Sequence, residues 1–127
     1  MRCMMLIKAN KDFEAGIPPS ERLIAEMSRL AEEMTRAGIL LSSEGMLPSS
    51  AGTRVRYAAG QRSVIDGPFA EAKELIGGFA IVQVASKQEA IQLAYHVAAI
   101  HAECGVGEFE LEVRPLFDPG ECAERAA

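Results

Sequence analysis

The chain has 127 residues, of which 49% are hydrophobic and 24% charged, and its formal net charge at pH 7 is −5. This length suits one globular domain that buries enough apolar surface to fold without metals or disulfides. The acidic balance and the scattered basic residues argue against binding to nucleic acid or an anionic membrane surface, because both partners need a basic footprint. No stretch of about 18 apolar residues occurs, so we expect no membrane-spanning helix.

Three cysteines, Cys3, Cys104 and Cys122, are an odd number without the spacing of a metal site. We therefore expect reduced thiols and a cytoplasmic protein. The apolar part of the opening segment, MRCMMLIKAN, is too short for a signal peptide, and no small-residue cleavage site follows it. We interpret this segment as a first strand.

The first predicted strand covers residues 2–9 and is apolar on both alternating faces, which is typical of the centre of a sheet. One face carries Cys3, Met5 and Ile7, and the other carries Met4 and Leu6. A loop over residues 10–20 follows, because this segment contains one glycine and two prolines.

A helix is predicted over residues 20–37. Ser20 can cap its start, and Gly38 can end it as a left-handed residue. Apolar side chains recur along one helical face, at Leu23, Met27, Leu30 and Met34.

A strand that runs into a loop is predicted over residues 39–48, and a hairpin follows it. The two strands of the hairpin cover residues 53–59 and 62–65, and the chain turns at Gly60. The first hairpin strand alternates Thr53, Val55 and Tyr57 with Arg54 and Arg56.

The second half of the chain is predicted to form, in order, a short helix over 70–76, a strand over 79–85, a helix over 86–101 and a strand over 107–117. Ser86 and Glu89 have the spacing of a capping box at the start of the long helix. The pair Gly77-Gly78 is expected to end the short helix. Residues 118–127 are expected to form a polar tail.

Without the hairpin and the short helix, the element order is β-α-β, β-α-β, the split βαβ pattern of a ferredoxin-like α+β domain. The two long helices are expected to cover one face of an antiparallel sheet. One apolar set of the first strand then points away from the helices, and a second copy of the sheet is its simplest cover. We therefore predict one domain over residues 1–117 that forms a homodimer.

The segment Asp66-Gly67-Pro68-Phe69 has two interpretations, which can hold together. In the first it is a structural corner, with an Asx-type turn closed by Asp66 and a left-handed backbone at Gly67. Pro68 then opens the short helix, and Phe69 enters the core. In the second, Asp66 lies at the mouth of a pocket as an acid–base or ligand-binding carboxylate.

Arginines on the polar faces of strands, Arg54, Arg56 and Arg114, suit a carboxylate or phosphate ligand if those faces line a cavity. The alternative is pairing with glutamates across strands at the surface. Lys8 ends a buried-looking strand, where burial would make its amine useful for chemistry; the alternative is a lysine that reaches water. The carboxylates of the predicted short helix are either an acid–base pair or a solvated face.

The two histidines, His96 and His101, are five residues apart on one helix, so their side chains diverge and no metal is expected. No serine or cysteine lies in a nucleophile elbow, and no glycine-rich phosphate loop follows a strand. The residues alone therefore identify no reaction.

The stretch VIDGPFAEAKELIGGFAIVQV (64–84), with EVRPLF (112–117), resembles the DGPF branch of the YCII-related family. The segments MLIKA, PPSERL and AGILLSSEGMLPSSAGTRVRY follow the layout of that branch, so the resemblance covers nearly residues 1–117. It implies a ferredoxin-like, dimeric α+β-barrel fold in a small bacterial cytoplasmic protein, mostly without assigned function. Some relatives are encoded beside, or fused with, extracytoplasmic-function sigma factors.

In the other YCII-related branch, a His–Asp pair in the pocket is the proposed acid–base centre. That pair does not carry over, because both histidines fall in the second long helix and Asp66 belongs to the DGPF motif. The large aromatic residue usual after GGF is Ala80 here, which either enlarges a cavity or repacks a core.

We therefore predict a pocket protein that binds a small molecule, anionic in character, with cofactor-independent acid–base catalysis left open. Asp66 is the candidate catalytic or binding carboxylate, and Arg54 and Arg114 would orient an anionic group. Lys8 and Glu44 are the further candidates; Glu44 enters because SEGMLP matches the family layout at a strand end, and its alternative is a loop carboxylate. No cofactor is expected. The alternative functions are a regulatory or protein-interaction module linked to transcription machinery, and a purely structural dimer.

Overall fold

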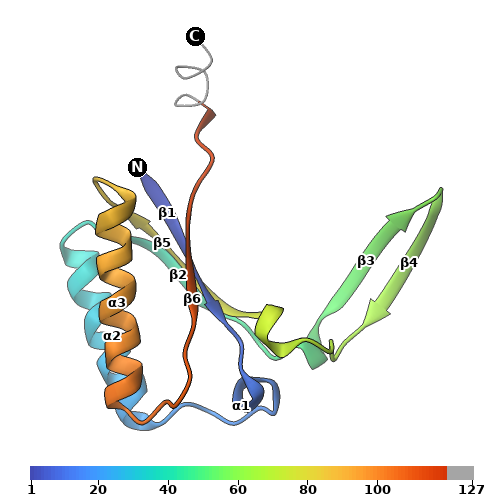
Figure 1. Cartoon of the computed structure of the whole chain (residues 1–127), viewed down its shortest axis with the longest axis horizontal. Coiled ribbons are helices and arrows are strands. Elements are labelled where there is room, and N and C mark those ends of the chain that lie inside the picture. The colour runs from blue at the N-terminus through green and yellow to red at the C-terminus, as the bar shows by residue number, and fades with distance from the viewer. Residues whose placement is uncertain (120–127) are drawn as a thin grey trace.

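The structure, a computed structural model, describes residues 1–119, apart from the side chain of Lys73. Its body is a four-stranded antiparallel sheet with strand order β2-β5-β1-β6, covered on one face by α2 and α3 (Figure 1). This arrangement agrees with the predicted ferredoxin-like α+β domain. The elements of the body are β1 (Arg2–Lys8), α2 (Glu21–Arg36), β2 (Leu40–Gly45), β5 (Ile76–Gln83), α3 (Lys87–Glu103) and β6 (Leu111–Pro115).

A second, two-stranded sheet projects from the body, and we call it the arm (residues 53–66). Its strands, β3 (Thr53–Ala58) and β4 (Gln61–Asp66), pair only with each other, as the predicted hairpin requires. Figure 1 shows the arm on the side of the main sheet opposite to α2 and α3. Residues 1–118 also contain three short helices: α1 (Lys11–Glu14), η1 (Ser49–Ala51) and η2 (Ala72–Glu74).

Both long helices begin at the predicted capping residues. The Ser20 hydroxyl accepts a hydrogen bond from the backbone N–H of Leu23 at 3.1 Å, and the Ser86 hydroxyl accepts one from Glu89 at 3.3 Å. The Glu89 carboxylate in turn accepts a bond from the N–H of Ala85. These bonds satisfy donors that the first helical turn leaves without partners.

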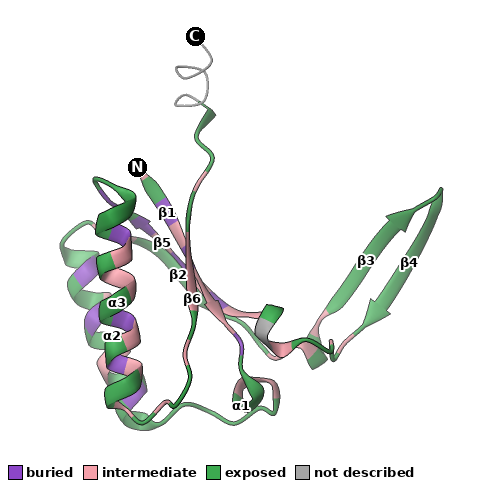
Figure 2. Ribbon diagram, in the orientation of Figure 1, coloured by how far each residue is buried: buried purple, intermediate pink, exposed green. Residues whose placement is uncertain are grey.

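The core lies between the sheet and the inner faces of α2 and α3, where Figure 2 shows the buried residues. Cys3 and Val82 are opposite each other on neighbouring strands, and both are fully buried. Met4 and Leu6, which alternate with the buried residues of β1, point to the other face and are half-buried. The predicted division of β1 into two apolar faces is therefore confirmed. The core residues are Cys3, Met5, Leu23, Leu30, Met34, Ala80, Val82, Val84, Ala90, Val97 and Ile100.

The short helix predicted over residues 70–76 is wrong. Only the three-residue turn η2 forms there, and β5 already begins at Ile76 and includes both Gly77 and Gly78. The N–H of Ala9 donates to the Leu75 carbonyl at 2.8 Å, which draws this segment alongside β1 in an extended form. Tertiary strand pairing thus overrides the local helix preference. Pro68 does not open a helix.

The other boundaries differ less. The predicted loop over residues 10–20 contains α1, whose N-cap Asn10 accepts a hydrogen bond from the N–H of Phe13 at 2.8 Å. The last strand begins at Leu111 instead of residue 107. Residues 120–127 of the predicted tail lie outside the described residues. Within residues 1–119, no helix has the length and apolar composition needed to cross a bilayer.

The buried thiol of Cys3 is expected to resist alkylation in the folded protein. Burial raises the pKa of Cys3 above its ordinary value of 9.0, because desolvation disfavours the thiolate, while the N-terminal amine and Lys87 act weakly in the opposite sense. Because the folded-state pKa is the higher one, the contribution of Cys3 to the free energy of unfolding is fully present below pH 9.0. This contribution is lost as pH rises through the folded-state pKa.

Iodoacetamide labelling at pH 8 of a Cys122→Ser variant checks this expectation. Cys3 should react at least about tenfold more slowly than the half-buried Cys104 in the folded state, because the thiolate is the reacting form and burial hides it. The two thiols should react at similar rates in denaturant. Equal rates in the folded protein would contradict the assigned burial.

Candidate functional site

The face of the main sheet that α2 and α3 leave uncovered, here called the open face, has an apolar centre. Met4 lies opposite Ile81, and Leu6 lies opposite Phe79, on the neighbouring strands β1 and β5. Residues directly opposite each other in an antiparallel pair share a face. All four side chains are half-buried, so the open face is apolar at its middle without being covered.

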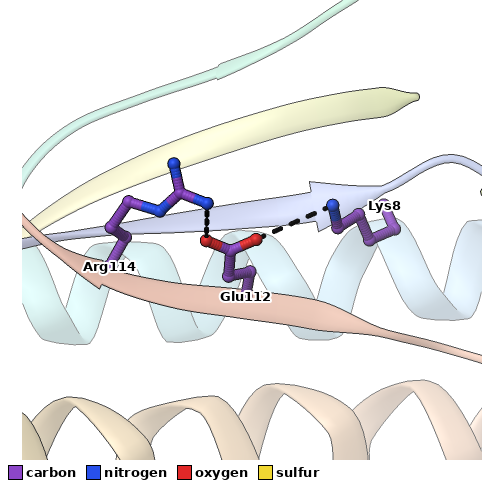
Figure 3. Close-up of polar contacts among 3 residues, drawn as sticks. All are labelled: Lys8, Glu112 and Arg114. Atoms are coloured by element: carbon purple, nitrogen blue, oxygen red, sulfur yellow. Dashed lines mark ion pairs between the residues drawn. The ribbon is translucent and has the colours of Figure 1, made fainter. Parts of the chain in front are cut away.

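A cluster of charged residues lies on the same face, beside this apolar centre. The register of β1 against β6 places Glu112 opposite Leu6 and Arg114 opposite Met4. Lys8 follows Leu6 by two residues on β1, so its side chain points to the same face. Figure 3 shows Lys8, Glu112 and Arg114 together on the side of the sheet away from the helices. We call these three residues the cationic cluster.

In the cationic cluster, two cations share one carboxylate. Lys8 Nζ lies 3.8 Å from Glu112 Oε1, and the guanidinium of Arg114 contacts the other carboxylate oxygen, Oε2 (Figure 3). The Lys8 side chain is 21% exposed, whereas that of Arg114 is 67% exposed. The group therefore carries one excess positive charge, and its guanidinium remains open to an anionic group. Arg114 does pair with a glutamate, Glu112, but along its own strand and not across strands as considered from the sequence.

Glu44 also belongs to the open face, because it lies opposite Phe79 in the pairing of β2 with β5. It does not join the cationic cluster. Strands β5 and β1 separate β2 from β6, so Glu44 and Arg114 are on strands roughly 14 Å apart at ordinary strand spacing. The exposed carboxylate of Glu44 thus marks the opposite edge of the face.

A cavity of about 400 Å³ adjoins Lys8, where β1 ends. Its volume suits a small molecule. The polar side chains around it carry both signs of charge, with two lysines and three glutamates. The lining includes Lys8, Asn10, Lys11, Glu71, Glu108 and Glu110. A second, mostly apolar cavity of about 380 Å³ lies between α2 and the sheet, and the core residue Ala80 lines it.

Asp66 and Arg54 lie at the base of the arm and belong to its separate sheet. The Asp66 carboxylate accepts a hydrogen bond from the Thr53 hydroxyl at 2.9 Å, across the β3–β4 pair. The Arg54 guanidinium lies 3.8 Å from the centroid of the Phe69 ring, in cation–π geometry. The structure therefore brings Lys8 and Arg114 together and places Arg54 and Asp66 elsewhere.

The Asp66-Gly67-Pro68-Phe69 segment forms a corner between the arm and the body, though not in the predicted manner. Asp66 bonds to Thr53 instead of closing an Asx turn, and Phe69 is half-buried outside the core cluster. Gly67 does not have a left-handed backbone, and its peptide bond to Pro68 is cis. Glycine is needed because a Cβ there would lie 1.8 Å from the carbonyl oxygen of Ser49.

The corner is held by a carboxylate that sequence reasoning missed. Glu14 of α1 accepts hydrogen bonds from Ser49, one from its backbone N–H at 2.8 Å and one from its hydroxyl. The Ser49 hydroxyl oxygen in turn accepts a bond from the N–H of Phe69 at 2.9 Å, and the N–H of Gly67 donates to Gly52. Residues 35 positions apart meet here, so no local signal in the sequence indicates the contact.

His101 makes packing contacts on α3. His101 Nδ1 lies 2.8 Å from the Val97 carbonyl oxygen, and its ring stacks on Phe109 with centroids 3.9 Å apart. These contacts place His101 in the packing of α3 against the segment before β6. Among residues 1–119, no group of three or more histidine, cysteine or acidic side chains could hold a metal ion.

Comparison with known proteins places the chain in a family. The YCII-related domain matches residues 1–116. An uncharacterized protein of Rhizobium meliloti (strain 1021) is 38% identical over 71 residues, which are 56% of this chain and 56% of that protein. The aligned region thus spans little more than half of this relative. Because the domain match covers nearly the whole chain, the protein belongs to the YCII-related domain family.

Proposed function

We propose that the protein binds a small anionic molecule at the cationic cluster, in a space enclosed by a second copy of the chain. The carrying observation is that Lys8 and Arg114 share the single carboxylate of Glu112 on an uncovered face. These three residues together carry a charge of +1, although the net charge of the chain is −5. A carboxylate or phosphate group suits the open guanidinium.

The proposed homodimer would form through the open face and would enclose the site. Met4, Leu6, Phe79 and Ile81 form an apolar centre that stays partly exposed within residues 1–119. A second sheet packed face to face about 10 Å away would bury this centre. The charged cluster at the edge of the face would then line the space between the two sheets. We also assign the chain to the DGPF branch of the family, on the strength of residues 66–69 and their corner.

The proposal is a binding function, with no reaction attached. Asp66, the candidate acid–base group, is exposed and hydrogen bonded to Thr53 in the corner. Its partner and its position are those of a structural residue. A second candidate function is a protein-interaction module, which the exposed apolar residues of the arm support; its link to transcription regulation is implied by the family resemblance alone.

Thermal unfolding with inorganic phosphate, pyrophosphate and citrate tests the binding function, with potassium chloride at matched ionic strength as reference. An anion at about 100 times its dissociation constant stabilises the folded protein by roughly 2.7 kcal/mol, which raises Tm by a few degrees. The shift should disappear in Arg114→Gln and shrink in Lys8→Met. The variant Arg36→Gln, which removes an exposed arginine from α2, should keep it.

Two results would contradict the proposal. One is the lack of any anion-specific shift beyond the chloride reference. The other is a shift of equal size in Arg114→Gln and in the wild type, since the bound anion would then lie elsewhere.

A further inference from the structure

The arm is exposed along its whole length. All fourteen of its residues are exposed, and its two strands pair with each other alone (Figure 2). A two-stranded hairpin with nothing packed against it is marginally stable in water. The arm therefore lacks the packing that normally maintains such a hairpin.

One face of the arm is rich in apolar surface. Val55 and Val64 lie directly opposite each other, and Tyr57 follows on the same face. Their exposed fractions are 72%, 66% and 74%. Apolar side chains gathered on an exposed surface mark a site of interaction.

The charge of the arm is opposite to that of the rest of the chain. Three arginines and one aspartate give the arm a charge of +2, which leaves −7 on the remainder of a chain whose total is −5. Within residues 1–119, Arg56 and Arg62 form no ion pair. The rest of a second copy, with its net negative charge, is thus electrostatically complementary to the arm.

The arm stands on the same side of the main sheet as the open face (Figure 1). Whatever covers the open face therefore lies beside the arm. A second copy seated there brings an apolar surface, its own open face, and a chain body of net negative charge. A two-fold axis makes the contact mutual, so that each copy gives one arm and receives one.

We propose that the arm is an intersubunit clasp, which packs Val55, Tyr57 and Val64 against a second copy of the chain seated on the open face. Arg62, which lies opposite Tyr57 on the same face of the arm, then faces that copy. This inference rests on the proposed homodimer and is independent of the bound anion. The clasp completes the enclosure of the open face from its arm side.

Sedimentation equilibrium over a wide concentration range tests the clasp. In an arm-shortened variant, Asn-Gly replaces residues 55–64 and joins Arg54 to Ile65, which are cross-strand partners, through a two-residue turn. A finer variant, Tyr57→Ser, has a matched control in Tyr95→Ser, because Tyr95 on α3 is 69% exposed and lies on the helix side. Thermal melts establish that each variant folds.

We expect the dimer dissociation constant to rise at least about tenfold in Tyr57→Ser, and further in the arm-shortened variant. Tyr95→Ser should leave it within about twofold of the wild type. Arg62→Glu should weaken association more at low salt than at high salt.

A folded arm-shortened variant with an unchanged dimer dissociation constant would overturn the clasp. The same result is expected if the arm binds a different protein, so that case also counts against the clasp. Ile81→Glu on the open face then separates the two claims. If Ile81→Glu dissociates the dimer and arm shortening does not, the open-face dimer stands and the clasp is wrong. A wild-type protein that is monomeric at all concentrations would overturn both, while anion binding would still be decided by the thermal shifts.

Discussion

Gly67→Ala is expected to lower the free energy of unfolding by about 3 kcal/mol, at the upper end of the ordinary range for overpacking. The added Cβ would lie 1.8 Å from the carbonyl oxygen of Ser49 and 2.7 Å from its carbonyl carbon. Both are backbone atoms, and Ser49 is itself held by the Glu14 carboxylate. The corner therefore cannot relieve the clash by a side-chain rotation, and urea unfolding should measure the full loss.

Gly45→Ala is the matched control, because a Cβ at Gly45 meets nothing within 4 Å. Its free energy of unfolding should stay within about 0.5 kcal/mol of the wild type. If Gly67→Ala were equally neutral, the close approach to Ser49 would be wrong, and with it the assignment of Gly67 to a structural corner.

Leu30→Ala is expected to destabilise the protein by about 3 kcal/mol, within the range for replacing a buried leucine by alanine and leaving a cavity. Leu30 is 6% exposed and belongs to the core cluster between α2 and the sheet. The deleted atoms leave a void inside this cluster, whose other members are also buried. Urea unfolding is again the measurement.

The same helix supplies the control for Leu30→Ala. Ile24 lies on the outer face of α2 and is 50% exposed, so Ile24→Ala should change the free energy of unfolding by less than about 1 kcal/mol. A loss of similar size at both positions would show that α2 does not present the assigned face to the core.

The two long helices could be predicted because their signals are local. Ser20 and Ser86 act as caps on amides three residues away, and the apolar residues of α2 recur at the helical period. The alternation in β1 is equally local, so its two faces were assigned correctly. From these elements and their order, the ferredoxin-like arrangement follows by general rules of connection.

The segment after Pro68 was predicted wrongly because its structure depends on distant partners. Residues 70–76 have good helix formers, yet β1 and β2 recruit the following residues into the sheet. Gly78 pairs with both of those strands, and a Cβ on it would lie 3.0 Å from the Glu44 carbonyl oxygen. Such a close approach appears only once the strands are assembled.

The candidate site shows the same division. Sequence reasoning selected Lys8 and Arg114 separately, as polar residues on strands, and the register of β1 against β6 brings them to one carboxylate. It also grouped Arg54 and Asp66 with them, because each residue type suits a pocket on its own. Whether polar residues on different strands meet depends on sheet order, which no single strand contains.

The corner at residues 66–69 is the point about which the arm can rotate relative to the body. A six-residue strand spans roughly 20 Å, so a rotation of about 10° at the corner moves the far tip by roughly 3.5 Å. The angle is set from the body by the bonds that run from Glu14 through Ser49 to Phe69. The carboxylate of Glu14, in the four-residue helix α1, therefore sets the position of the arm's tip without contacting it. A substitution of Glu14 would displace the tip of the arm more than its base.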